Sequence, residues 1–158
     1  MYLTPFRPDI LFRVCLCARF QSDPKESHLT AVKRILRYLN GTTNVGLCYR
    51  KSKEFQLVGY CNVDFAGDRV ERKSTPRSCQ FLGENFISWY IKKQSTIALS
   101  TTEAEYVATA GCSTQMLWMK SQLEDYHLYE CKIPIFYDNT SSICLSKNPI
   151  LDSKAKYI

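Results

Sequence analysis

The sequence has few groups that bind zinc and no apolar segment long enough to cross a membrane. It contains two histidines, His28 and His127, and its eight cysteines include no CxxC pair. No apolar run approaches the roughly 20 residues of a membrane span, and the first residues lack the basic and apolar regions of a signal peptide. We therefore expect neither a zinc site nor a membrane contact, and a cytoplasmic or nuclear location.

The cysteines leave two interpretations open. Their even number is compatible with disulfides, but most are scattered through apolar segments of predicted helices or strands, as small core residues are. We favour reduced thiols. Any metal site should then use oxygen ligands, which is typical of magnesium or manganese.

The net charge of +6 lies entirely in the first third of the chain. Residues 1–54 hold ten Lys or Arg against four Asp or Glu, whereas residues 55–158 hold eleven of each kind. A basic arm beside a neutral body suits contact with a polyanion such as nucleic acid. A solubilising helix face would have the same composition, so both interpretations stay open.

The first third predicts two helices. The shorter one is expected at residues 8–20. The second should open at Asp23, which can cap it, with Pro24 in its first turn and Glu26 completing a capping box. Apolar residues then recur at helical spacing as far as Gly41, where we expect the helix to end.

From residue 45 onward the pattern changes to that of a mixed α/β domain. Ser100 and Glu103 form a capping box that predicts a helix to about residue 126, and a short helix is expected at 141–146. Runs rich in β-branched and aromatic residues predict strands at residues 45–49, 56–63, 78–82, 86–91 and 133–138. Strands followed by a long helix, a strand and a helix indicate an α/β fold.

Acidic residues lie in three separate places along this domain. Asp138 ends a predicted strand, and Glu105 lies near the start of the long helix. The strand at 56–63 also ends in an acidic turn, but there Asn62 precedes Asp64. Acids at two strand ends and on a helix can converge on divalent metals. An amide at position 62 leaves such a site short of negative charge.

Several motifs occur in the order found in a known family. They are HLTAVKRILRYLNG at 28–41, DFAGD at 64–68, RKST at 72–75, ISW at 87–89, KKQ at 92–94, LSTTEAEY at 99–106 and YDN at 137–139. In these motifs the chain resembles the Pol polyproteins of copia-type retrotransposons over almost its whole length. The resemblance implies the end of a reverse transcriptase in residues 1–50 and a ribonuclease H-like domain in residues 51–158. That fold is a mixed five-strand sheet with flanking helices, whose last strand would lie beyond residue 158.

The family's activity, as the resemblance implies it, is hydrolysis of RNA in RNA–DNA hybrids by two magnesium or manganese ions held by carboxylates. Glu105 and Asp138 match two of its catalytic and metal-binding acids. The first strand of the family reads Ser-Asp-Ala-Asp, so Asn62 stands in place of the first acid. Asp64 is a further candidate ligand, but two residues along a strand is roughly 6.6 Å. Its alternative role is to cap the turn before Gly67.

Two further departures from the family pattern accompany Asn62. Pro76 and Arg77 replace a usual Ser-Gly, so Arg77 brings bulk and charge to a glycine position. A fourth acid of the family lies on a strand after the segment that matches residues 153–158. Glu103 we interpret as the capping partner of Ser100 rather than as a ligand. These departures indicate relaxed constraint on the metal site.

Basic residues near the predicted site are candidates for binding an RNA–DNA hybrid. Arg72, Lys73, Lys92 and Lys93 could hold phosphates, which positions a nucleic acid without reading its sequence; a solvated strand edge would look the same. Trp89 could pack beside a sugar, although we favour a core position for it.

Three hypotheses follow from the sequence. The first is a ribonuclease H-like domain with impaired activity, whose partners are hybrids and the rest of a Pol polyprotein. The second is a catalytically inactive relic that binds nucleic acid through its basic helices, in a salt-dependent manner. The third is a transposon fragment with no independent role.

Overall fold

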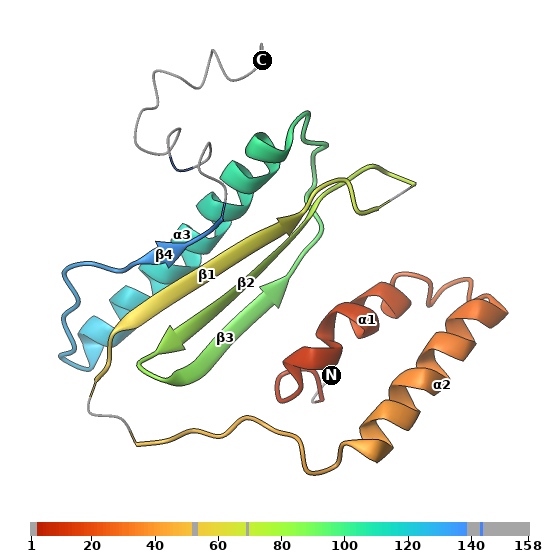
Figure 1. Ribbon diagram of the computed structural model, residues 1–158, viewed down its shortest axis with the longest axis horizontal. Helices are drawn as coiled ribbons and strands as arrows, with labels where there is room; N and C mark the ends of the chain where they lie inside the picture. Colours follow the sequence, from red (N-terminus) through yellow and green to blue (C-terminus); the bar gives the residue numbers. More distant parts are fainter. Residues whose placement is uncertain (1–2, 52–53, 69, 139–142, 144–158) are drawn as a thin grey trace. The chain divides into compact units, whose positions relative to one another are not determined.

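In the computed structural model the chain forms two compact units, Met1–Tyr49 and Arg50–Ile158. The structure describes residues 3–51, 54–68, 70–138 and 143. Figure 1 shows the helices and strands of both units. Within the described ranges, no helix combines the length and the apolar character that a membrane span requires.

The first unit is a pair of helices, α1 (Pro8–Ala18) and α2 (Glu26–Gly41). Both lie where the sequence predicts them, and α1 starts on its proline as expected. The predicted cap at Asp23 is wrong, because α2 begins at Glu26. Instead, the imidazole of His28 accepts a hydrogen bond from the backbone N–H of Lys25 at 3.0 Å. The side chain of His28, the third residue of the helix, thus provides a hydrogen-bond partner for the N–H of Lys25, which precedes the helix.

Arg7 holds the start of α1 against the end of α2. Its buried guanidinium donates to both carboxylate oxygens of Asp9, at 3.0 and 2.8 Å. The same group donates to the carbonyl and the hydroxyl of Thr42, at 3.0 and 2.8 Å. The Tyr38 hydroxyl donates to Asp9 at 2.8 Å. Charge-assisted bidentate pairs of this kind are among the stronger hydrogen bonds in proteins.

Residues 45–49 do not form the strand that their composition predicts. Val45 and Tyr49 are 50% and 59% exposed, and the sheet of the described residues does not include this segment. A strand is stable only where a neighbour takes its backbone N–H and C=O groups. Cys48, expected in the core, is accordingly exposed.

The second unit is built on a four-stranded mixed sheet. The antiparallel neighbours β1 (Leu57–Asp64), β2 (Thr75–Leu82) and β3 (Asn85–Ile91) follow one another along the chain. β4 (Ile135–Phe136) then pairs parallel to β1, so the order is β3-β2-β1-β4. The predicted α/β class with a mixed sheet is confirmed.

A long helix, α3 (Thr101–Asp125), connects β3 to β4 and packs against β1 and β2 (Figure 1). The predicted cap at Ser100 is confirmed, because its hydroxyl accepts from the Glu103 N–H at 3.1 Å, but the returning bond of the capping box goes to Leu99 instead of Ser100. The Glu103 carboxylate accepts from the Leu99 N–H at 2.8 Å. The strand predicted at 133–138 is shorter than expected. Of the helix predicted at 141–146, all residues except 143 lie outside the described part of the chain.

The core lies between α3 and the inner face of the sheet. Its buried residues come from β1 and α3, namely Leu57, Cys61, Cys112, Met116 and Met119. Gly59 lies directly beneath Met116, where an added Cβ would stand 3.1 Å from the sulfur atom. The absence of a side chain at position 59 allows α3 to approach β1 closely. Cys61 and Cys112 occupy the core as free thiols, as predicted.

A row of aromatic side chains crosses the other face of the sheet. Neighbouring ring centroids lie between 4.9 and 5.7 Å apart. The row runs through Phe136, Tyr60, Phe81, Phe86 and Trp89, and so includes every strand. Cross-strand aromatic pairs stabilise strand order. Trp89 is therefore half-buried at the end of this row rather than enclosed in the core.

Asp9→Asn should change how the first unit responds to acid. Hydrogen bonds from Arg7 lower the pKa of Asp9 to about 2, from 3.8. A carboxyl with a depressed folded pKa contributes stability above its unfolded pKa and loses it as pH falls toward the folded one. Between about pH 5 and pH 2 the unmodified chain should lose on the order of 1 kcal/mol more than Asp9→Asn, allowing for solvent screening. Urea unfolding followed by circular dichroism measures this, and identical pH profiles would contradict it.

Candidate functional site

A small, tight hollow lies where β1, α3 and the end of β4 meet. It is lined by Cys61, Asn62, Glu105, Ala108, Thr109, Tyr137 and Asp138. The three positions predicted to be catalytic, 62, 105 and 138, therefore line one hollow although they are far apart in the sequence. Ala108, Thr109 and Tyr137 were not singled out by sequence reasoning. The signal available for Thr109 was its place four residues after Glu105, on the same side of a helix.

Asn62 and Asp138 both line the hollow, and each lies near the end of one of two neighbouring strands. β1 and β4 are parallel, with Tyr60 paired to Phe136. Asp138 lies two residues beyond Phe136, where β4 ends, and Asn62 lies two residues beyond Tyr60 on β1. Both side chains are exposed. In parallel strands the carboxyl ends meet at one edge of the sheet, which brings these residues together.

Glu105 reaches the hollow from the second turn of α3. Its neighbours Ala104 and Ala108 are buried against the sheet, so this part of the helix lies close to β1. The Thr109 hydroxyl donates to the Glu105 carbonyl at 2.8 Å and lies 3.6 Å from the Cys61 sulfur. Glu105 itself is half-buried. The small alanines allow the acid of the helix to approach the strand that carries Asn62.

The acids of the hollow affect the pKa of the Cys61 thiol. A hydrogen bond with Cys112 lowers the pKa of the Cys61 thiol, while burial and the charges of Glu105 and Asp138 oppose that shift. The same bond, together with burial, raises the pKa of Cys112. Two carboxylates thus act on one thiol.

The residues of the hollow do not fit a two-metal site. Such a site needs several carboxylates to offset two dications a few ångströms apart, and here Glu105 and Asp138 stand beside the neutral amide of Asn62. Across the described part of the chain, no group of three or more His, Cys, Asp or Glu side chains is arranged to hold a metal ion. Magnesium or manganese binding by these residues stays a prediction.

Asp64 lies outside the hollow. Its carboxylate is packed so closely over Gly67 that a Cβ there would overlap it. The guanidinium of Arg77 lies 3.9 Å from the same carboxylate. Asp64 is therefore directed into the turn after β1, the place its capping role requires.

The four basic candidates for phosphate binding differ in their surroundings. Lys93 pairs with Asp68 and, at 3.0 Å, with Glu71, and Lys73 pairs with Glu71 at 2.7 Å. The bond from Lys93 lowers the pKa of Asp68 to about 2. These pairs fix the turn between β1 and β2.

The other two basic candidates, Arg72 and Lys92, are exposed. Arg72 has a positive φ of 54°. Sequence reasoning did not foresee the pairing of Lys93 with Asp68, because a charged turn gives no indication of which acid a distant lysine will reach. Phosphate binding stays a prediction for all four.

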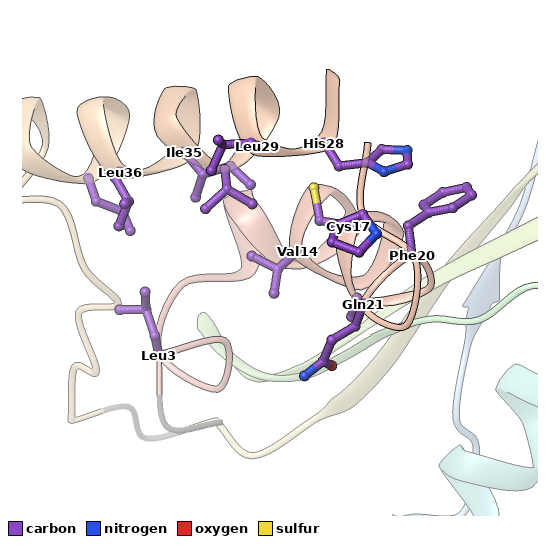
Figure 2. A pocket seen from close by; sticks show the side chains of 13 residues that line it. Leu3, Val14, Cys17, Phe20, Gln21, His28, Leu29, Ile35 and Leu36 are labelled. Carbon is purple, nitrogen blue, oxygen red and sulfur yellow. The ribbon is translucent and has the colours of Figure 1, made fainter. Parts of the chain in front are cut away.

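The first unit carries an apolar groove of about 500 Å³ between its helices. Figure 2 shows the side chains that line it, among them Val14 from α1 and Leu29 and Leu36 from α2. The last two are 53% and 59% exposed. At its end the rings of Phe20 and His28 stack with centroids 4.2 Å apart. The two helices thus leave much apolar surface uncovered by each other.

Curated proteins with similar sequences include two long polyproteins. The chain is 40% identical over 158 residues to the retrovirus-related Pol polyprotein from transposon RE1 of Arabidopsis thaliana, matching 99% of this chain and 11% of the relative. It is 41% identical over 152 residues to the retrovirus-related Pol polyprotein from transposon TNT 1-94 of Nicotiana tabacum, matching 96% and 11%. The chain thus spans about a ninth of these relatives, 11% of their length.

A shorter relative is the secreted RxLR effector protein 161 of Plasmopara viticola. The two are 41% identical over 113 residues, which cover 72% of this chain and 80% of the relative. No protein-family profile matches the chain, and no solved structure matches it. The similarity therefore rests on sequence relatives alone.

Gly67→Ala should destabilise the turn after β1. The added Cβ would overlap the Asp64 carboxylate, so this half-exposed side chain must turn away. We expect a loss of about 0.5–1 kcal/mol in the free energy of unfolding, measured in urea. Gly46→Ala is the control, since no atom lies within 4 Å of its Cβ position. The double variant Asp64→Ala/Gly67→Ala should lose less than the sum of the single changes. Additive losses would contradict the close packing of Asp64 on Gly67.

Proposed function

Because the chain belongs to the family of copia-type, retrovirus-related Pol polyproteins of transposons, we propose that Arg50–Ile158 is the ribonuclease H-like domain of such a polyprotein. The helices α1 and α2 are then the last part of its reverse transcriptase. These relatives extend far beyond the part that the chain matches. The rest of such a polyprotein is the partner that we propose for both units.

One observation carries the proposal: Asn62, Glu105 and Asp138 line a single hollow. They come from β1, from α3 and from the residues after β4, which are the elements that hold the acids of a ribonuclease H site in the family. Three antiparallel strands, a long helix and then a strand parallel to the first also follow the family's order. The aromatic row and the α3 packing supply a rigid support for that site.

The family's activity is cutting the RNA strand of RNA–DNA hybrids, and in this chain we propose that it is impaired. An amide oxygen at position 62 carries no net charge, so the hollow offers two carboxylates where the reaction needs more. Loss of groups that only orient metal ligands already costs roughly 10–100-fold. Replacing a ligand itself should cost at least as much.

A second function, binding of nucleic acid without cutting, is favoured by the charge of the first unit. The exposed side chains of Lys33, Arg34 and Arg37 line α2 away from its apolar groove. A basic helix face attracts phosphates without reading the sequence of bases. The chain would then retain affinity for hybrids while having lost the chemistry.

Cleavage of a labelled RNA–DNA hybrid tests the first proposal. The unmodified chain should not cut it in Mg²⁺. At high Mn²⁺, Asn62→Asp should cut it at least roughly 100-fold faster than the unmodified chain does in the same Mn²⁺. Adding Glu105→Gln to Asn62→Asp should abolish that gain. Rapid Mg²⁺-dependent cutting by the unmodified chain would overturn the impairment. A gain that survives Glu105→Gln would overturn the site.

Salt titration of hybrid binding tests the second. Arg34→Gln/Arg37→Gln should weaken binding and flatten the plot of log affinity against log salt by roughly 0.7–0.9 for each phosphate that the helix no longer neutralises. Arg50→Gln/Lys132→Gln removes the same charge from exposed positions of the second unit. Equal effects of the two pairs would show that net charge, rather than the α2 face, governs binding.

A further inference from the structure

We infer that Arg77 excludes divalent cations from the end of the sheet that carries Asn62. The inference rests on the proposed function and deepens it. Asn62 lines the hollow, and Arg77 is its partner on the neighbouring strand. Both residues then oppose metal binding there. Restoring a carboxylate at position 62 alone would create an ion pair before it created a metal ligand.

Arg77 stands directly across from Asn62. The register of β1 and β2 pairs these two residues, and directly opposed residues of antiparallel strands point to the same face of the sheet, with Cβ atoms about 4.5–5.5 Å apart. Arg77 is also paired through its backbone to Ile91 of β3. Because β2 is an interior strand, the main chain at this position is held from both sides. Only side-chain rotation can move the guanidinium.

The guanidinium already lies beside an acid of the same strand as Asn62. Its distance to the Asp64 carboxylate is 3.9 Å, and both side chains are 50% exposed. Asp64 lies two residues beyond Asn62 along β1 and is paired with Thr75. A side chain that reaches this diagonal position is long enough to reach position 62, which is nearer. Asp64 is the one charged residue of β1 between positions 62 and 64, and the charge of Arg77 offsets it.

A permanent positive charge at this place opposes metal binding for electrostatic reasons. Arginine keeps its proton throughout the ordinary pH range, so it cannot adapt by becoming neutral. Its charge repels a dication and competes with it for any carboxylate at position 62. The planar guanidinium matches a carboxylate in two hydrogen bonds. The family pattern has glycine here, which has neither charge nor reach.

The test compares Mn²⁺ affinity in the full chain, by electron paramagnetic resonance, for Asn62→Asp and for Asn62→Asp/Arg77→Gln. Removal of the guanidinium charge should tighten Mn²⁺ binding about tenfold. Asn62→Asp/Arg77→Lys keeps the charge and should bind like Asn62→Asp. Asn62→Asp/Arg50→Gln is the charge-matched control, because Arg50 bonds Asn85 at the opposite end of the sheet. It should also bind like Asn62→Asp.

A second readout needs no metal. In chelator, Asn62→Asp should raise the melting temperature in the presence of Arg77 and not in the Arg77→Gln background, since the new acid gains a cross-strand partner. Arg77→Thr, which favours strands, replaces Arg77→Gln if circular dichroism shows that variant unfolded.

The outcomes separate this inference from the proposed function. Equal Mn²⁺ affinity of Asn62→Asp and Asn62→Asp/Arg77→Gln overturns the role of Arg77 and leaves the ribonuclease H-like assignment standing. Mn²⁺ binding by no folded variant overturns both. A tightening that Arg50→Gln reproduces also overturns the role of Arg77, because net charge would then be the cause.

Discussion

Close packing of α3 on β1 is the constraint on which the hollow depends. Gly59 lets Met116 approach the strand, and the buried Ala104 and Ala108 keep the start of the helix low over the sheet. Glu105 lies between these alanines and is therefore brought to the strand beside it. Larger side chains at these positions would lift the helix and separate the acids. The site is in this sense a product of small residues in the core.

The electrostatics of the second unit follow from which charges are compensated. Lys93 and Lys73 are held by acids of the turn between β1 and β2, and Arg77 lies beside Asp64. Most of the charges there thus stabilise the turn. Glu105 and Asp138 remain at the hollow, where they act on the pKa of Cys61. The four strands of the described sheet carry one acid, Asp64, and one base, Arg77, which lie beside each other.

Sequence reasoning predicted the elements with strong local signals. The cap at Ser100 set the start of α3, and patterned runs gave β1 and the parallel strand that brings Asp138 to Asn62. It failed where partners decide, as in residues 45–49, which have no strand beside them in the described sheet. Sequence reasoning also identified Arg77 as a departure from the family pattern, but it did not predict that Arg77 lies across from Asn62. Strand register is a property of the folded sheet.

Mn²⁺ titration of the unmodified chain, followed by NMR line broadening, tests the central claim most directly. That claim is that a ribonuclease H-like arrangement of Asn62, Glu105 and Asp138 no longer holds two metal ions. At millimolar Mn²⁺ the account predicts weak, non-saturating broadening that does not favour the backbone amide signals of these three residues. Saturable binding of two ions, with broadening confined to these positions, would contradict it.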